Sequence, residues 1–86
     1  MSIRVVLGED NVLVREGVRA LLDSYDEIEV VGVAEDAPSL LSAAAEHVPD
    51  VVVTDIKMPN MDGMALLAKL REQDVELPVI VTWMSA

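Results

Sequence analysis

Short apolar runs rich in β-branched residues alternate along this chain with longer segments in which apolar residues recur at helical spacing. Four of the short runs predict β-strands, at residues 3–7, 28–34, 51–54 and 79–81. In the second run Glu29 faces away from Ile28 and Val30, an alternation that is typical of a partly solvated edge strand. The third and fourth runs are apolar without alternation, which predicts strands covered on both faces.

Three segments between these runs carry the helical period. The first helix has Asn11 as its N-cap, and its apolar stripe leaves Arg15 and Arg19 on the opposite side. The second helix is capped by Asp36 and has a proline in its first turn, where a missing N–H is harmless. The third helix spans about residues 62–74. The order β-α-β-α-β-α-β predicts an α/β domain around a parallel sheet.

Composition limits the chain to one small domain without thiol chemistry. It has 86 residues, no cysteine and a formal net charge of −10. Phosphate backbones and anionic lipid surfaces repel so acidic a segment, and we therefore expect no direct binding to nucleic acid or membrane. The N-terminus lacks the apolar core of a signal peptide, and no apolar stretch approaches the ~20 residues of a membrane span. These features predict a cytoplasmic location.

Acidic residues stand directly at the ends of two predicted strands. Glu9 and Asp10 follow the first strand, and Asp55 follows the third. Ligands bind at the carboxyl ends of strands in an open parallel sheet, so these carboxylates converge if the two strands are neighbours. Their mutual repulsion favours a cation, and an all-oxygen set selects a hard ion, with Mg²⁺ fitting best. A carboxylate beside such an ion can attack phosphorus, and Asp55 is the best placed to do so.

The loop after Asp55 starts with turn chemistry, because the Met-Pro pair at 58–59 favours extended backbone and Asn60 favours a turn. Together, the segments 5–10, 51–63 and 77–81 resemble the receiver domain of two-component response regulators. The segment 13–22 is similar to the LuxR/NarL-type subclass in particular. The resemblance covers essentially the whole chain. Its most specific motif is the Asp-x-x-Met-Pro-x-Met-Asp-Gly loop behind an apolar strand.

The resemblance implies a flavodoxin-like fold with strand order 2-1-3-4, in which the fifth strand and the last two helices of a complete receiver are absent. It also implies that Asp55 is a phosphoryl acceptor that takes its phosphoryl group from a sensor histidine kinase. Asp10 and Asp55 would ligate Mg²⁺ directly, Glu9 would act through a water, and the backbone carbonyl of Lys57 would complete the set. Such a domain is not an enzyme in its own right, although it slowly hydrolyses its own acyl phosphate.

Two features depart from the receiver pattern. Receiver domains place a Thr or Ser at the end of the fourth strand to hydrogen-bond a phosphoryl oxygen, but the usual position holds Trp83 here. Thr82, one residue early, is the first candidate for this role, and Ser85 is the alternative. A one-residue shift turns a side chain to the other face, so Thr82 can serve only if the strand starts early or carries a bulge. The fifth-strand Lys that pairs with the phosphate also has no counterpart.

Other functional classes compete for the same residues. A haloacid-dehalogenase-like phosphatase also uses an Asp nucleophile with Mg²⁺, but it needs a second Asp two residues later, where this chain has Lys57. A cofactor-binding α/β module would need a glycine-rich phosphate cradle after its first strand, and residues 8–11 do not supply one. The stronger alternative is a truncated receiver that no longer signals and acts as a structural or oligomerising unit.

The expected fold, a single partial receiver domain over residues 1–86, leaves the fourth strand as an open edge. We expect another chain to cover this edge in a homo-oligomer or domain-swapped dimer, unless the sequence is part of a longer gene product. Full-length relatives of the subclass carry a C-terminal DNA-binding helix-turn-helix and regulate transcription. No such element is predicted within these residues, so DNA binding is not assigned to this segment.

Overall fold

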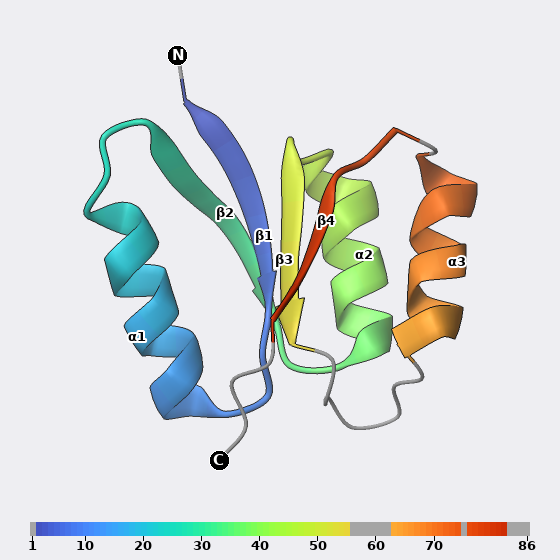
Figure 1. Cartoon of the computed structure of the whole chain (residues 1–86), viewed down its shortest axis with the longest axis horizontal. Coiled ribbons are helices and arrows are strands. Elements are labelled where there is room, and N and C mark those ends of the chain that lie inside the picture. The colour runs from blue at the N-terminus through green and yellow to red at the C-terminus, as the bar shows by residue number, and fades with distance from the viewer. Residues whose placement is uncertain (1, 56–62, 75, 83–86) are drawn as a thin grey trace.

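The computed structural model describes residues 2–55, 63–74 and 76–82. Its seven elements alternate as the sequence pattern predicts (Figure 1): β1 (Ile3–Gly8), α1 (Val12–Asp23), β2 (Ile28–Ala34), α2 (Ala37–His47), β3 (Val51–Asp55), α3 (Gly63–Gln73) and β4 (Val79–Thr82). The strands pair in parallel in the order β2-β1-β3-β4. The predicted flavodoxin-like arrangement is therefore confirmed.

The first two helices begin where their capping residues place them. The Asn11 side chain accepts hydrogen bonds from the N–H groups of Leu13 and Val14, at 3.0 and 3.2 Å. Asp36 accepts from both the hydroxyl and the N–H of Ser39, and these two hydrogen bonds lower the pKa of Asp36. Each cap accepts hydrogen bonds from N–H groups that have no partner within the first turn of the helix. The capping residue therefore determines where the helix begins and how many residues separate it from the preceding strand.

The two faces of the sheet are covered unequally. Helices α2 and α3 lie on one face and α1 on the other (Figure 1). The main core lies on the α2–α3 face and consists of Val6, Ala34, Leu40, Ala44, Val52, Leu66, Leu70 and Leu77. On the opposite face Val5 and Leu7 are buried, but α1 itself has no buried residue. The α1 side is thus the more open side of the domain.

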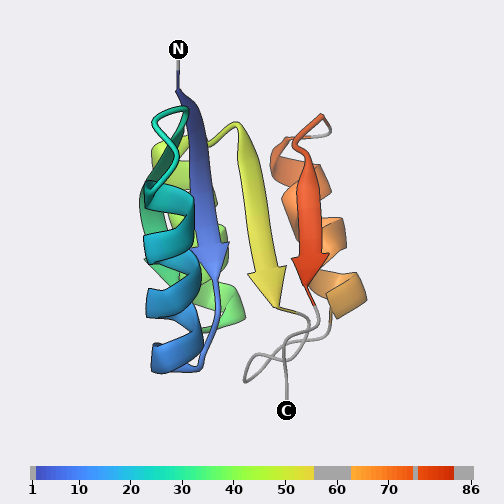
Figure 2. The same ribbon diagram turned by 60° about the vertical axis from the view of Figure 1, so that its left-hand side comes forward.

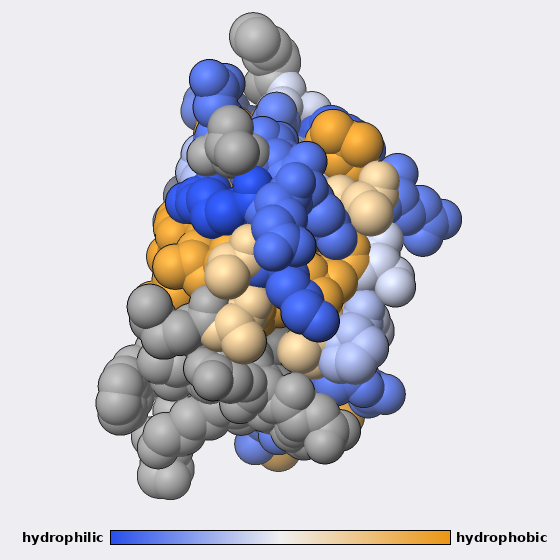
Figure 3. All heavy atoms as spheres, turned by 90° about the vertical axis from the view of Figure 1, so that its right-hand side faces the viewer, coloured by the Kyte–Doolittle hydropathy of each residue, from blue (hydrophilic) through white to orange (hydrophobic). Residues whose placement is uncertain are grey.

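Strand β4 is not covered on both faces, contrary to what its unbroken apolar run predicts. Ile80 and Val81 point to opposite faces by strand alternation, and they are 54% and 53% exposed. Helix α1 packs on β1 and β2, at the far side of the sheet from β4 (Figure 2). Apolar surface is also visible beside polar side chains on the side of the molecule where α3 lies (Figure 3). An apolar run alone does not distinguish a buried strand from an open edge.

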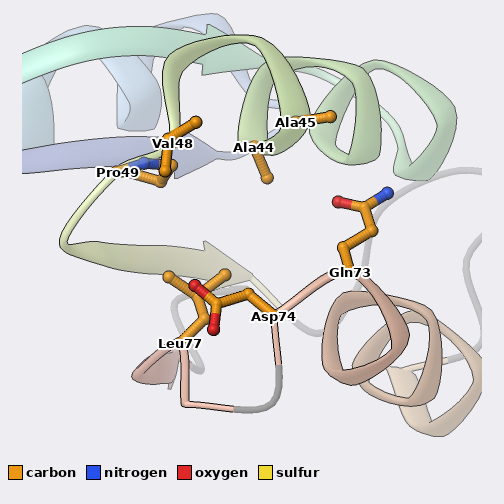
Figure 4. A pocket seen from close by; sticks show the side chains of 7 residues that line it. All are labelled: Ala44, Ala45, Val48, Pro49, Gln73, Asp74 and Leu77. Carbon is orange, nitrogen blue, oxygen red and sulfur yellow. The ribbon is translucent and has the colours of Figure 1, made fainter.

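A groove of about 330 Å³ lies between the carboxyl ends of α2 and α3 (Figure 4). Its lining is mainly apolar and consists of Ala44, Ala45, Val48, Pro49, Gln73, Asp74 and Leu77. Pro49 and Leu77 stand just before β3 and β4, so this groove is at the amino ends of the strands. Among the described residues, no helix has the length and apolar character to cross a membrane.

Candidate functional site

The acidic residues at the carboxyl ends of β1 and β3 meet, as predicted. The two strands are neighbours, with Gly8 in register with Thr54, so the residues that follow these positions emerge side by side. One carboxylate oxygen of each of Glu9, Asp10 and Asp55 lies within 4.8 Å of the other two. The register of two paired strands therefore fixes the separation of Glu9 and Asp55.

Burial makes this cluster electrostatically unusual. Glu9 and Asp55 are each only 3% exposed, whereas Asp10 is exposed. Glu9 Oε1 accepts a hydrogen bond from the Asn11 N–H at 3.3 Å, but its Oε2 is buried and has no hydrogen-bond partner in the described part of the chain. Burial above all, then a hydrogen bond with Asp55 and the charges of Asp55 and Asp10, raises the pKa of Glu9 to about 7. Without a cation, Glu9 therefore keeps its proton to a higher pH than an ordinary glutamate and is about half protonated near pH 7.

Gly8 allows the strands and α2 to come close where the acidic residues emerge. A Cβ at position 8 would lie 2.8 Å from Thr54 Oγ1 and 3.3 Å from the methyl groups of Leu40. Thr54 is 1% exposed, and its hydroxyl donates to the carbonyl of Asp55 at 3.1 Å. Gly8 and Thr54, which directly precede Glu9 and Asp55 in the chain, are thus tightly packed against each other.

The donor set fits a hard divalent cation. The three carboxylates offer only oxygen ligands, and the buried Glu9 Oε2 is an acceptor that lacks a donor among the described residues. Mg²⁺ prefers one or two carboxylates and keeps several waters, which suits a cluster with two buried members and one exposed member. Asp10, Asp55 and Glu9 are the residues that would hold it. Lys57, whose carbonyl the resemblance adds, lies outside the described residues.

Thr82 ends β4 beside the acidic cluster. The β3–β4 register runs without a shift to the pair formed by Asp55 and Thr82, so the two side chains leave the same face of the sheet. Thr82 is half-buried, and its hydroxyl donates to the Thr54 carbonyl at 3.3 Å. β4 starts at Val79 and reaches Thr82 with neither the early start nor the bulge that this residue was expected to need. The alternative, Ser85, lies outside the described residues.

Arg15 contradicts its predicted placement on the outer side of α1. It is half-buried, and its Nη1 donates to the Glu9 carbonyl at 3.1 Å. Arg19 is solvated as predicted and lies 3.9 Å from Asp23. A helical side chain leans toward the helix N-terminus, so a long arginine near the start of a helix can reach the preceding loop.

Comparisons with known proteins agree with this geometry. The family model of the response regulator receiver domain matches residues 5–85. The probable transcriptional regulatory protein NarL of Mycobacterium tuberculosis (strain ATCC 25618 / H37Rv) is 42% identical over 85 residues, which are 99% of this chain and 38% of the relative. The protein-glutamate methylesterase/protein-glutamine glutaminase 1 of Chromobacterium violaceum is 38% identical over 81 residues, which are 94% of this chain and 22% of the relative.

A solved structure is similar over nearly all of the described fold. The signal receiver domain of the putative response regulator NarL from Mycobacterium tuberculosis has 41% sequence identity and a TM-score of 0.80. The alignment covers 93% of this chain and 63% of that domain. The chain therefore spans less than two thirds of this domain and of the curated relatives that it matches.

Proposed function

This chain belongs to the response regulator receiver domain family of two-component systems, and on this premise we propose that Asp55 is its phosphoryl acceptor. The observation that carries the proposal is the meeting of Glu9, Asp10 and Asp55 within 4.8 Å at the carboxyl edge of the sheet. Asp55 ends a central strand, and the buried Thr54 hydroxyl holds its carbonyl. A carboxylate on so rigid a support can be presented repeatedly in one orientation to an incoming phosphorus.

We propose that Asp10 and Asp55 bind Mg²⁺ directly, with Glu9 acting through a water and the Lys57 carbonyl completing the set. When bound, Mg²⁺ would neutralise the negative charge that a phosphoryl group brings to three carboxylates. Glu9 would release its proton on binding, because a nearby cation stabilises the charged carboxylate against the burial that otherwise raises its pKa. Asp55 would then lie beside the cation as the nucleophile.

The reaction that suits this site is phosphoryl transfer from a phosphohistidine of a sensor histidine kinase. A carboxylate oxygen of Asp55 forms the new P–O bond, the P–N bond breaks, and the imidazole leaves with the electron pair. Thr82 would turn its hydroxyl from the Thr54 carbonyl to a phosphoryl oxygen. The product is an acyl phosphate on the domain itself, which slow hydrolysis would return to the carboxylate. The domain therefore accepts a signal rather than turning over a substrate.

The intact acidic site favours this function over a receiver fragment with a purely structural role. The order of the sheet, the convergence of the acids and the position of Thr82 beside Asp55 support this proposal. We propose that phosphorylation switches an output, which the name of the NarL relative suggests is transcriptional. We also propose that the domain acts in the cytoplasm.

We further propose that a second copy of this chain pairs along β4 in the isolated 86-residue protein. In the described residues β4 is the last strand of the sheet, and its outer edge has no partner strand. Ile80 and Val81 are more than half exposed, and β4 carries no charge that would repel a second copy at this edge. An open edge is complementary to itself across a two-fold axis, because each copy offers the same row of N–H and C=O groups.

Binding of beryllofluoride, which mimics an acyl phosphate, tests the proposed acceptor. Fluorine NMR of the wild-type chain with beryllofluoride should show a bound signal that needs Mg²⁺ and disappears in Asp55→Asn. A bound signal of equal intensity in that variant would overturn the assignment of Asp55. No bound signal in folded wild-type protein would favour the structural fragment.

A further inference from the structure

Arg15 lies beside the acidic cluster without being one of its members. It stands near the start of α1, is half-buried, and donates from Nη1 to the Glu9 carbonyl at 3.1 Å. The other arginines in the described residues make their contacts elsewhere: Arg4 with the Val48 carbonyl, Arg19 with Asp23, and Arg71 with the Leu77 carbonyl. Among the arginines in the described residues, Arg15 is thus the one that contacts the segment that carries Glu9 and Asp10.

This contact completes the anchoring of the Glu9 backbone. The Glu9 N–H donates to the Ala34 carbonyl at 2.9 Å, which ties the residue to β2. Its carbonyl is held from the other side by Arg15 on α1. The two hydrogen bonds hold the planar peptide groups on either side of the Glu9 Cα and so restrict the direction of its Cα–Cβ bond. The carboxylate at the end of this side chain lies beside Asp55.

The remaining hydrogen-bonding capacity of Arg15 argues against a role in the fold alone. Its Nε is buried and has no hydrogen-bond partner among the residues described. An unpaired buried donor costs stability, so an arginine that served only the fold would be expected to satisfy it. The side chain also borders a small cavity of about 230 Å³ and is not densely packed on that side. The contact with Glu9 therefore best accounts for where the guanidinium lies.

We propose that Arg15 is a positioning residue for the metal site, which holds the Glu9 carbonyl and so keeps the Glu9 carboxylate directed at Asp55. This inference rests on the proposed function, because it concerns the same Mg²⁺ site. A hydrogen bond from a charged donor is stronger than one between neutral groups. Partners of metal ligands typically contribute about 10- to 100-fold to metal affinity, so we expect loss of Arg15 to weaken Mg²⁺ binding by about tenfold.

Calorimetric titration of the 86-residue chain with Mg²⁺ tests the proposal. Arg15→Met removes the donor while keeping much of the apolar stem, and it should weaken binding by about tenfold. Arg15→Lys, whose ammonium can still reach toward the carbonyl, should recover most of the affinity. Arg19→Met is the matched control, since Arg19 stands one turn further along α1 and pairs with Asp23. It should bind Mg²⁺ like the wild type.

A double-mutant cycle with Glu9→Gln separates positioning from a general effect on the fold. If Arg15 acts through Glu9, Arg15→Met should have little further effect on Mg²⁺ affinity in the Glu9→Gln background. An equal loss of affinity in both backgrounds would overturn the proposal, as would an unchanged affinity in Arg15→Met alone. If Arg15→Met unfolds at the assay temperature, Arg15→Lys is compared with Arg15→Gln, which is too short to reach the carbonyl. Equal affinities of these two variants would also overturn it.

The same titration distinguishes failure of this inference from failure of the proposed function. A wild-type chain that is folded and binds no Mg²⁺ would overturn both. Mg²⁺ binding with the expected variant pattern, but without beryllofluoride binding, would support Arg15 as a positioning residue and reject the acceptor role of Asp55. Mg²⁺ and beryllofluoride binding with no dependence on Arg15 would reject only the inference.

Discussion

The carboxylates of Glu9 and Asp55 end two neighbouring strands and lie within 4.8 Å of each other, although each residue is only 3% exposed. Burying two carboxyl groups at this separation is unfavourable, and the raised pKa of Glu9 reflects above all the cost of its burial, to which the hydrogen bond with Asp55 and the charge of Asp55 add. A fold that is stabilised by burying apolar residues gains nothing from this pair. The arrangement makes sense for a site whose stable form contains a cation.

Mg²⁺ affinity should depend strongly on Asp10. Asp10→Asn keeps the size of the side chain but removes one of the charges directed at the cation. We expect Mg²⁺ binding to weaken by at least about tenfold, since even groups that only support metal ligands can contribute that much. Glu16→Gln, an exposed acid on α1, is the matched control for the loss of one negative charge. Equal affinities in these two variants would contradict the proposed ligand set.

Metal-free stability should fall as the pH rises from about 4.5 to about 7. The pKa of Glu9 is raised from its ordinary value of 4.5, so in this window the folded state binds more protons than the unfolded state. The proton on Glu9 contributes fully to the free energy of unfolding below the pKa that Glu9 has in the unfolded state. This contribution is lost as the pH rises toward and through the pKa of Glu9 in the folded state. Denaturant titrations in the presence of a chelator would measure this slope.

Glu9→Gln should remove that slope, because an amide does not titrate. Saturating Mg²⁺ should also stabilise the wild type most at the high end of the window, where about half of the Glu9 side chains have lost their proton. A wild-type stability that rises steadily from pH 5 to pH 7, or equal slopes in the two proteins, would contradict the assigned pKa of Glu9.

Two glycines should respond to alanine in opposite directions. Gly8→Ala places a methyl group 2.8 Å from Thr54 Oγ1, and overpacking of this kind typically costs about 1–3 kcal/mol. Gly17 lies within α1, and a Cβ added there would have no atom within 4 Å, so Gly17→Ala should stabilise the chain by about 0.5–1 kcal/mol. Chemical denaturation of both variants measures these changes. A neutral Gly8→Ala would show that Gly8 and Thr54 are loosely packed against each other.

Self-association should depend on β4. Sedimentation of the isolated chain should show a concentration-dependent dimer, and Ile80→Lys should shift it toward monomer because edge lysines oppose strand pairing. Leu13→Lys is the control, since Leu13 is 84% exposed but lies on α1. A wild-type chain that is monomeric at high concentration, or equal association in the two variants, would exclude pairing along β4.

Most of the fold could be predicted from the sequence because its elements are local. Asn11 and Asp36 mark the helix starts by their own hydrogen bonds, and the apolar runs identify all four strands. The convergence of Glu9 with Asp55 followed from one topological rule for parallel sheets. These features depend on short segments or on general geometry, so a single sequence suffices to find them.

The features that the sequence did not reveal depend on long side chains and on partners distant in the chain. The apolar stripe suggested the opposite side of α1 for Arg15, but at 3.6 residues per turn Arg15 lies on the same side of the helix as the half-buried Leu22, and from there its guanidinium reaches Glu9. The apolar run in β4 predicted burial on both faces, whereas Ile80 is more than half exposed; the open edge that β4 forms was expected from the resemblance and not from the run itself. Periodicity gives the direction of a Cβ atom and not the final contacts.

The central claim is that Asp55 accepts a phosphoryl group, and intact-protein mass spectrometry after incubation with acetyl phosphate tests it most directly. With Mg²⁺ present, the wild type should gain the mass of one phosphoryl group, and the gain should vanish in Asp55→Asn or after chelation of the metal. Asp26→Asn, an acid between α1 and β2 at the amino ends of the strands, should be phosphorylated like the wild type. A gain of the same size in Asp55→Asn, or none in folded wild-type protein, would contradict the claim.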